Sequence, residues 1–187
     1  EGIECTMRIL DQLTNDNNKQ QKESCYINLN SSFHGRTFMA ATLSDSCRET
    51  YKQTFKLQKS IQQMVSVPIN DISYFTKTIH SLVNSKYISG IIMEPVMGEG
   101  NPGQAVSPEF YNCVRTLSNE YSIPLVIDSV QAGLRTRGCL SISNYPGFEN
   151  SDIPDFEVFS KAITNGHYPL SIIGIHEKYK SCNFEGL

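Results

Sequence analysis

The feature that most constrains the fold is the alternation of short apolar segments with amphipathic, helix-like segments. Five apolar segments have the length of strands, at 25–30, 88–96, 124–128, 156–159 and 170–175. Around them, apolar residues recur three and four positions apart, as on one face of a helix. These residues are Ile3, Met7, Leu10 and Leu13, then Ile72, Phe75, Ile79 and Leu82, then Phe110, Val114, Leu117 and Tyr121. Strands that alternate with helices predict an α/β fold with a mostly parallel sheet flanked by helices.

Two of the expected helices also carry start signals. Residues 70–71 (Asn-Asp) precede the second apolar stripe, and residues 107–108 (Ser-Pro) combine an N-cap with proline at the first helical position. Elsewhere the local pattern is weaker. The polar run 15–24 predicts a solvated loop, and 44–66 predicts irregular surface structure with some helical turns.

Composition excludes several classes of protein. The chain has 187 residues, of which 39% are hydrophobic, so it can bury a core and is not disordered. Its 16 Lys and Arg residues nearly balance 19 Asp and Glu residues, so no nucleic-acid partner is expected. No apolar run is long enough to predict a membrane span. The six cysteines form no CxxC motif, which favours reduced, packing cysteines over disulfides and predicts no metal site.

Three ionisable residues lie at or just after the ends of expected strands. In a parallel sheet, ligands bind beyond the carboxyl ends of the strands. Glu94, Asp128 and Lys161 occupy such positions. Taken singly, a strand-end aspartate usually caps a turn, and a lysine after a strand is usually a solvated surface residue. The three together fit many kinds of enzyme.

The residues around these positions carry a resemblance to a known family. The chain has FHGRT at 33–37, EPVMGEG at 94–100, DSVQ at 128–131, SKA at 160–162 and GHYPL at 166–170. In this order the sequence resembles the class III aminotransferases of the ornithine, 4-aminobutyrate and acetylornithine type. These enzymes depend on pyridoxal phosphate (PLP). The resemblance covers nearly the whole chain and implies the large domain of the PLP-dependent transferase fold, type I.

The resemblance implies a set of cofactor-binding residues. Lys161 corresponds to the lysine that forms a Schiff base with the cofactor, and the apolar strand before it can supply the desolvation that a free amine needs. Asp128 corresponds to the carboxylate that keeps the pyridine nitrogen protonated, which preserves the electron sink. Gln131 corresponds to the glutamine that hydrogen-bonds the phenolic oxygen, and Phe33 to the aromatic residue that stacks on the ring. His34, in the same motif as Phe33, is expected beside the cofactor without a role in proton transfer.

The resemblance also implies residues that contact substrate. Arg36 is similar to the arginine that clamps a substrate carboxylate, although a structural salt bridge is an alternative. Glu99 is similar to the glutamate that pairs with a mobile arginine in ornithine- and 4-aminobutyrate-type enzymes. Glu94 is expected either to contact substrate or to make structural hydrogen bonds. Ser129 departs from the family pattern, in which an acidic residue is usual.

The function implied is transfer of an amino group from an ω-amino donor, such as ornithine, lysine or 4-aminobutyrate, to a 2-oxo acid. Alternatives are another activity on the same fold (mutase, racemase or decarboxylase) and a truncated relative that binds PLP without turnover. Because family members are much longer, residues 1–187 are expected to be part of the large domain, without the small domain and both termini of the parent enzyme. Such a piece is expected to be inactive alone. The complete protein is expected to be a homodimer located inside the cell, in the cytoplasm or the mitochondrial matrix.

Overall fold

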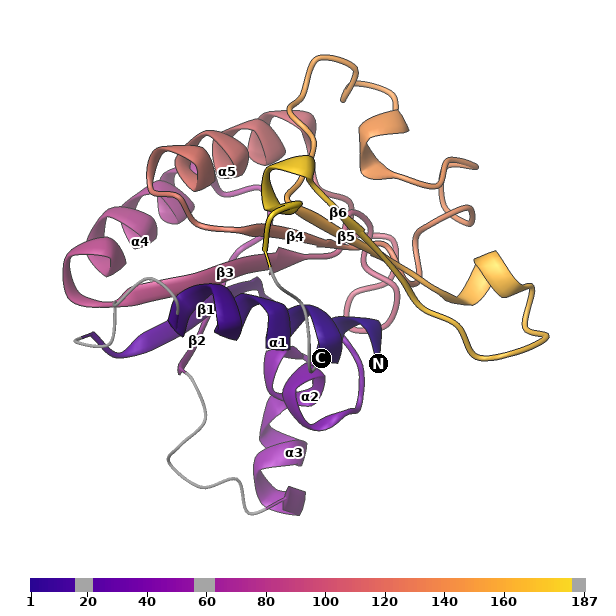
Figure 1. Ribbon diagram of the computed structural model, residues 1–187, viewed down its shortest axis with the longest axis horizontal. Coiled ribbons are helices and arrows are strands. Elements are labelled where there is room, and N and C mark those ends of the chain that lie inside the picture. The colour runs from indigo at the N-terminus through magenta and orange to yellow at the C-terminus, as the bar shows by residue number, and fades with distance from the viewer. Residues whose placement is uncertain (16–21, 56–62, 183–187) are drawn as a thin grey trace.

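The computed structural model, which describes residues 1–15, 22–55 and 63–182, contains one six-stranded sheet (Figure 1). The strands are β1 (Ser24–Leu29), β2 (Gln63–Val67), β3 (Tyr87–Met93), β4 (Leu125–Asp128), β5 (Phe156–Phe159) and β6 (Ile172–Ile175). Their order is β2-β1-β3-β4-β5-β6. The first five pair in parallel, and only β6 runs antiparallel to its neighbour β5. The predicted α/β fold with a mostly parallel sheet is confirmed.

Two of the helices begin where the sequence places capping residues. The helices are α1 (Gly2–Asn15), α2 (Phe38–Leu43), α3 (Arg48–Phe55), α4 (Ile72–Ser85) and α5 (Pro108–Glu120). The Asp71 carboxylate accepts a hydrogen bond from the N–H of Tyr74 at the start of α4. The Ser107 hydroxyl does the same for Phe110 at the start of α5, where Pro108 is the first helical residue. Each cap satisfies a backbone donor that the helix itself leaves unpaired.

Helices cover both faces of the sheet. Figure 1 shows α4 and α5 on one side and α1 on the other. Alternate residues of a strand therefore enter different cores. In β1, Cys25 and Ile27 pack in the core under α4 and α5, whereas Tyr26 packs with α1. Because helices cover both faces, the carboxyl ends of the parallel strands lie together along one uncovered edge of the sheet.

The segment 44–66 differs from its prediction. The predicted helical turns are present there as the regular helix α3, but after residues that the structure does not describe the segment also enters a strand, β2. Neither face of β2 is fully buried: three of its five residues are half-buried and Gln63 is exposed. The strand therefore needs no regular alternation of apolar and polar residues, and its sequence shows none. Pairing with β1 makes it a strand. The loop predicted for 15–24 falls largely outside the described residues.

All six cysteines are free, as predicted. None of the helices among the described residues is both long and apolar enough to cross a membrane. Within the same ranges, no cluster of three or more His, Cys, Asp and Glu side chains could hold a metal ion.

Candidate active site

A cavity of about 150 Å³ lies at the carboxyl ends of β3, β4 and β5. Its lining includes most of the residues that the sequence singled out: Phe33, His34, Glu94, Asp128, Gln131 and Lys161. The wall also includes the first residues of α1 and Ser171, which precedes β6. The three ionisable residues predicted at strand ends thus share one cavity, although they come from distant parts of the chain.

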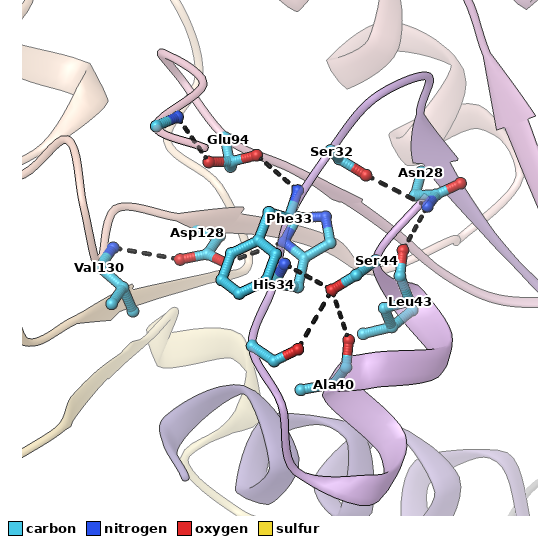
Figure 2. A network of polar contacts seen from close by, with 12 residues as sticks. Asn28, Ser32, Phe33, His34, Ala40, Leu43, Ser44, Glu94, Asp128 and Val130 are labelled. Carbon is cyan, nitrogen blue, oxygen red and sulfur yellow. Dashed lines mark hydrogen bonds and ion pairs between the residues drawn. The ribbon is translucent and has the colours of Figure 1, made fainter. Parts of the chain in front are cut away.

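At the base of the cavity, Asp128 and His34 form a buried pair. Asp128 is the last residue of β4, and its Oδ2 lies 2.8 Å from His34 Nδ1 (Figure 2). Its Oδ1 accepts a hydrogen bond of 3.1 Å from the N–H of Val130. Burial lowers the pKa of His34, but the hydrogen bond and charge of Asp128, with the charge of Glu94, raise it above the ordinary value overall. The Nε2 atom of His34 is buried and has no hydrogen-bond partner among the described residues.

The loop that carries Phe33 and His34 is held by α2. The His34 N–H donates to Ser44 Oγ over 2.8 Å, and this hydroxyl donates in turn to the carbonyl of Ala40 over 2.9 Å (Figure 2). Asn28, on β1, donates to Ser32 Oγ in the same loop and also to the carbonyl of Leu43. The imidazole therefore reaches Asp128 from a backbone that two elements fix.

Glu94 uses both of its carboxylate oxygens inside the protein. Oε2 accepts from the N–H of Phe33 over 2.9 Å, and Oε1 accepts from the N–H of Gly98 over 3.0 Å (Figure 2). The residue is 2% exposed, and burial raises the pKa of its carboxyl. Of the two roles expected for Glu94, this geometry favours the structural one: it fixes two loops at the rim of the cavity.

Gln131 packs directly against Gly98. A Cβ atom added to Gly98 would lie 1.3 Å from Gln131 Oε1, far inside any possible contact distance. Only glycine at this position leaves room for the glutamine side chain in this conformation. Glu94 holds the N–H of Gly98, so it also fixes the surface on which Gln131 rests.

Lys161 follows β5 and Ser160, and begins a short 3-10 helix (Lys161–Thr164). Its φ angle is 40°, in the left-handed region that residues other than glycine rarely adopt. Such strained residues cluster at functional sites. The expectation that the preceding apolar strand desolvates the amine is not met, because Lys161 lies beyond the strand at the rim of the cavity and is exposed.

Arg36 and Glu99 do not line the cavity. Both side chains are exposed. The guanidinium carbon of Arg36 lies 5.8 Å from the centre of the Phe33 ring, and Phe33 itself lines the cavity. Arg36 is therefore beside the rim, whereas Glu99 lies on the loop that follows Gly98.

One buried carboxylate near the site was missed by the sequence reasoning. Glu157, in the middle of β5, is 6% exposed and accepts a hydrogen bond of 2.6 Å from Ser129 Oγ. The signal that could have found it is an acidic residue inside the otherwise apolar segment 156–159. Ser129, which departs from the family pattern, thus has an acidic partner on the neighbouring strand.

Known proteins resemble this chain in sequence. The profile of the family "Aminotransferase class-III" matches residues 1–183. An acetylornithine aminotransferase of Prochlorococcus marinus is 34% identical over 150 residues, which are 78% of this chain and 33% of that protein. Ornithine aminotransferase 1 of Staphylococcus saprophyticus is 32% identical over 157 residues, 83% of this chain and 36% of that protein. The chain thus spans about a third of the length of the curated relatives it matches.

Solved structures share the fold at lower identity. A taurine:2-oxoglutarate aminotransferase of Bifidobacterium kashiwanohense, solved in complex with PLP and glutamate, superposes with a TM-score of 0.75 at 18% identity. The match covers 98% of this chain and 43% of that chain. An ornithine aminotransferase of Toxoplasma gondii gives a TM-score of 0.72 at 18% identity, covering 92% of this chain and 39% of the other.

Proposed function

The chain belongs to the class III aminotransferases, and from that premise we propose that it is part of the cofactor-binding large domain of a PLP-dependent transaminase. One observation carries the proposal: the amine of Lys161 and the buried Asp128–His34 pair line the same cavity. An amine that can bond an aldehyde and a carboxylate that can pair with a cationic ring nitrogen are the two groups that this cofactor needs from a protein.

The other residues of the cavity fit the remaining parts of PLP. Phe33 offers an aromatic ring, and Gln131 offers an amide that can donate to an oxygen. The wall also includes Glu1 and the first two residues of α1, Gly2 and Ile3. The N-terminus of a helix has free N–H groups and a partial positive charge, which suit a phosphate.

When bound, PLP supplies an electron sink that stabilises negative charge on a substrate carbon. Asp128 holds a proton on the ring nitrogen, because its buried carboxylate favours a cation there. The hydrogen bond between His34 Nδ1 and Asp128 Oδ2 fixes the orientation of this carboxylate. Lys161 Nζ would hold the cofactor at its aldehyde carbon, and as a free amine it would accept a proton from the substrate carbon.

For the complete protein we propose an ω-amino donor, such as ornithine, lysine or 4-aminobutyrate, and a 2-oxo acid acceptor. The curated relatives are named as acetylornithine and ornithine aminotransferases. Arg36, beside Phe33 at the rim, is the residue we propose for a substrate carboxylate, and Glu99 lies on the neighbouring loop. A homodimer and a location inside the cell stay predictions.

The test is to add PLP to the protein, reduce with borohydride and locate the modified lysine by mass spectrometry. We expect the label on Lys161, no label in Lys161→Ala, and an unchanged label in Lys77→Ala, whose lysine is exposed on α4. A label on any other lysine would contradict the proposal. Dependence of turnover on a 2-oxo acid then separates transamination from a mutase, racemase or decarboxylase activity.

A further inference from the structure

Glu157 is a buried carboxylate that the proposed mechanism does not use. Its hydrogen bonds come from neutral donors, and burial raises the pKa of its carboxyl. The donors are Ser129 Oγ at 2.6 Å, Ser141 Oγ at 2.6 Å and the N–H of Ile142 at 3.0 Å. Burying a carboxyl group is costly unless hydrogen bonds satisfy it. An apolar residue at this position of the strand would avoid this cost but could accept no hydrogen bonds. We therefore ask what the three hydrogen bonds to Glu157 hold in place.

The three donors lie at the two ends of a single loop, residues 129–142, here called the 129–142 loop. Ser129 follows Asp128 directly, and Ser141 and Ile142 begin the next 3-10 helix. The loop carries Gln131, which lines the cavity. Glu157 thus fastens both ends of the loop to β5.

The two arms of the loop lie close together. A Cβ atom on Gly133 would be 2.8 Å from the carbonyl oxygen of Ser129 on one arm and 3.2 Å from that of Leu140 on the other. Beyond this contact the tip is exposed, including Arg135 and Arg137. The Leu134 N–H donates to the carbonyl of Cys139 across the two arms over 2.9 Å, and Glu157 bonds the loop at the sheet, where the arms begin and end.

We propose that Glu157 is a positioning residue of the active site. By joining both ends of the 129–142 loop, it keeps the Val130 N–H on the carboxylate of Asp128 and keeps the side chain of Gln131 at the cavity. It acts through these residues and does not contact the reacting atoms. The consequence for the cofactor rests on the proposed function, whereas the closure of the loop does not.

Trypsin cleavage measures how firmly the two ends of the 129–142 loop are held together, and it needs no cofactor. Trypsin cleaves after arginine, and Arg135 and Arg137 are at the exposed tip of this loop. Glu157→Leu removes every acceptor, whereas Glu157→Gln keeps an oxygen for Ser129 and Ile142 and offers an amide donor to Ser141. Under native conditions we expect about tenfold faster cleavage at the tip in Glu157→Leu, since local opening sets the rate. Glu157→Gln should be cleaved as the wild type is. Ser118→Ala is the control, because it removes two buried hydrogen bonds outside the loop, one of 2.8 Å to the carbonyl of Ile123 and one of 3.1 Å from Arg115.

The second readout is the visible absorption maximum of added PLP and its dissociation constant. Glu157→Leu should shift the absorption and weaken binding about tenfold, whereas Glu157→Gln and Ser118→Ala should match the wild type. If Glu157→Leu does not fold, Ser141→Ala, which removes one of the three bonds, takes its place with a smaller effect in the same direction.

Two outcomes would overturn the inference. One is tip cleavage and cofactor absorption in Glu157→Leu that equal those of the wild type. The other is an equal rise of tip cleavage in Ser118→Ala, which would show general loss of stability. Failure of the wild type to capture PLP would instead count against the proposed function, and the cleavage result would still decide whether Glu157 closes the loop.

Discussion

At the scale of single residues, the buried pair of Asp128 and His34 dominates the site. Asp128 has hydrogen-bond partners on both oxygens, from His34 and from Val130. A carboxylate that is oriented from two sides in a water-poor site needs little reorganisation when it pairs with a cation. The pair therefore fixes where a positively charged ring nitrogen can lie.

Asp128→Asn should lower the rate of transamination by the complete protein about a thousandfold, or ~4 kcal/mol in the barrier. Asparagine has nearly the same shape but cannot stabilise the proton on the ring nitrogen. Steady-state kinetics measure the effect, with the exposed Asp152→Asn as the control. A rate near that of the wild type would mean that Asp128 only caps the end of its strand.

The raised pKa of His34 makes stability depend on pH in a defined direction. A group whose folded pKa exceeds its ordinary 6.5 stabilises the protein fully below that pH, and this contribution is lost as the pH rises through the folded pKa. We expect His34→Gln to cost about 1.5–3 kcal/mol in unfolding free energy at acidic pH, the usual strength of a hydrogen bond to a charged group. The deficit should shrink towards alkaline pH.

Denaturant titrations of the wild type and of His34→Gln, from acidic to alkaline pH, measure the difference in unfolding free energy. Burial also raises the pKa of Glu94 and of Glu157, which gives both proteins a trend in the same direction. Subtraction of the two curves removes the contribution of Glu157 and leaves that of His34 together with its charge interaction with Glu94. A difference that is constant with pH would show that the imidazole stays neutral.

At the scale of elements, the cavity is built from loops that follow β1, β3, β4 and β5, and these loops fix one another. Glu94, after β3, holds the backbone of Phe33 and of Gly98. Gly98 in turn supports Gln131 from the loop after β4. A change in one loop should therefore appear in the neighbouring one.

Gly98→Ala tests this coupling, because its methyl group would occupy the place of the Gln131 amide. We expect PLP affinity to fall about tenfold, close to the loss of one hydrogen bond. Gln131→Ala should give the same loss, and the double variant should lose no more, since both changes remove one interaction. Gly174→Ala is the control, as its Cβ would make only ordinary contacts of 3.5 Å and 3.7 Å. Additive losses in a titration of cofactor fluorescence would contradict the coupling.

The elements also show what the sequence predicts and what it does not. Buried strands and capped helices are predictable, because segments such as 124–128 and caps such as Ser107 carry local signals. The edge strand β2 is not, since its half-buried residues depend on pairing with β1. Within the candidate site, the motif positions predict Asp128 and Lys161, which line one cavity. The exposure of Lys161 and the contacts of Glu157 depend on tertiary packing.

At the scale of the whole molecule, the residues that the structure describes enclose the candidate site only in part. Lys161 is exposed at the rim, and Arg36 and Glu99 lie outside the cavity. Catalysis of this type gains from exclusion of water and from fixed orientation of the substrate. Curated relatives have about two further thirds of sequence that this chain does not match.

We therefore expect residues 1–187 alone to capture PLP slowly and weakly and to show no turnover that depends on a 2-oxo acid. The assay supplies ornithine, lysine or 4-aminobutyrate with 2-oxoglutarate, and a full-length relative is the positive control. Turnover within about tenfold of that relative, a barrier difference of ~1.4 kcal/mol, would contradict this expectation.

The parallel sheet has a consequence for how the molecule folds. His34 and Asp128 are 94 positions apart in the chain, yet their side chains meet at the base of the cavity. Contacts of such long sequence separation form late and slowly, because the chain loses entropy in closing large loops before these contacts can stabilise it. The binding site can exist only when β1, β3, β4 and β5 are all in register. A ligand that binds there binds only the complete sheet. By mass action it would therefore lower the population of every species in which one of these strands is still unpaired.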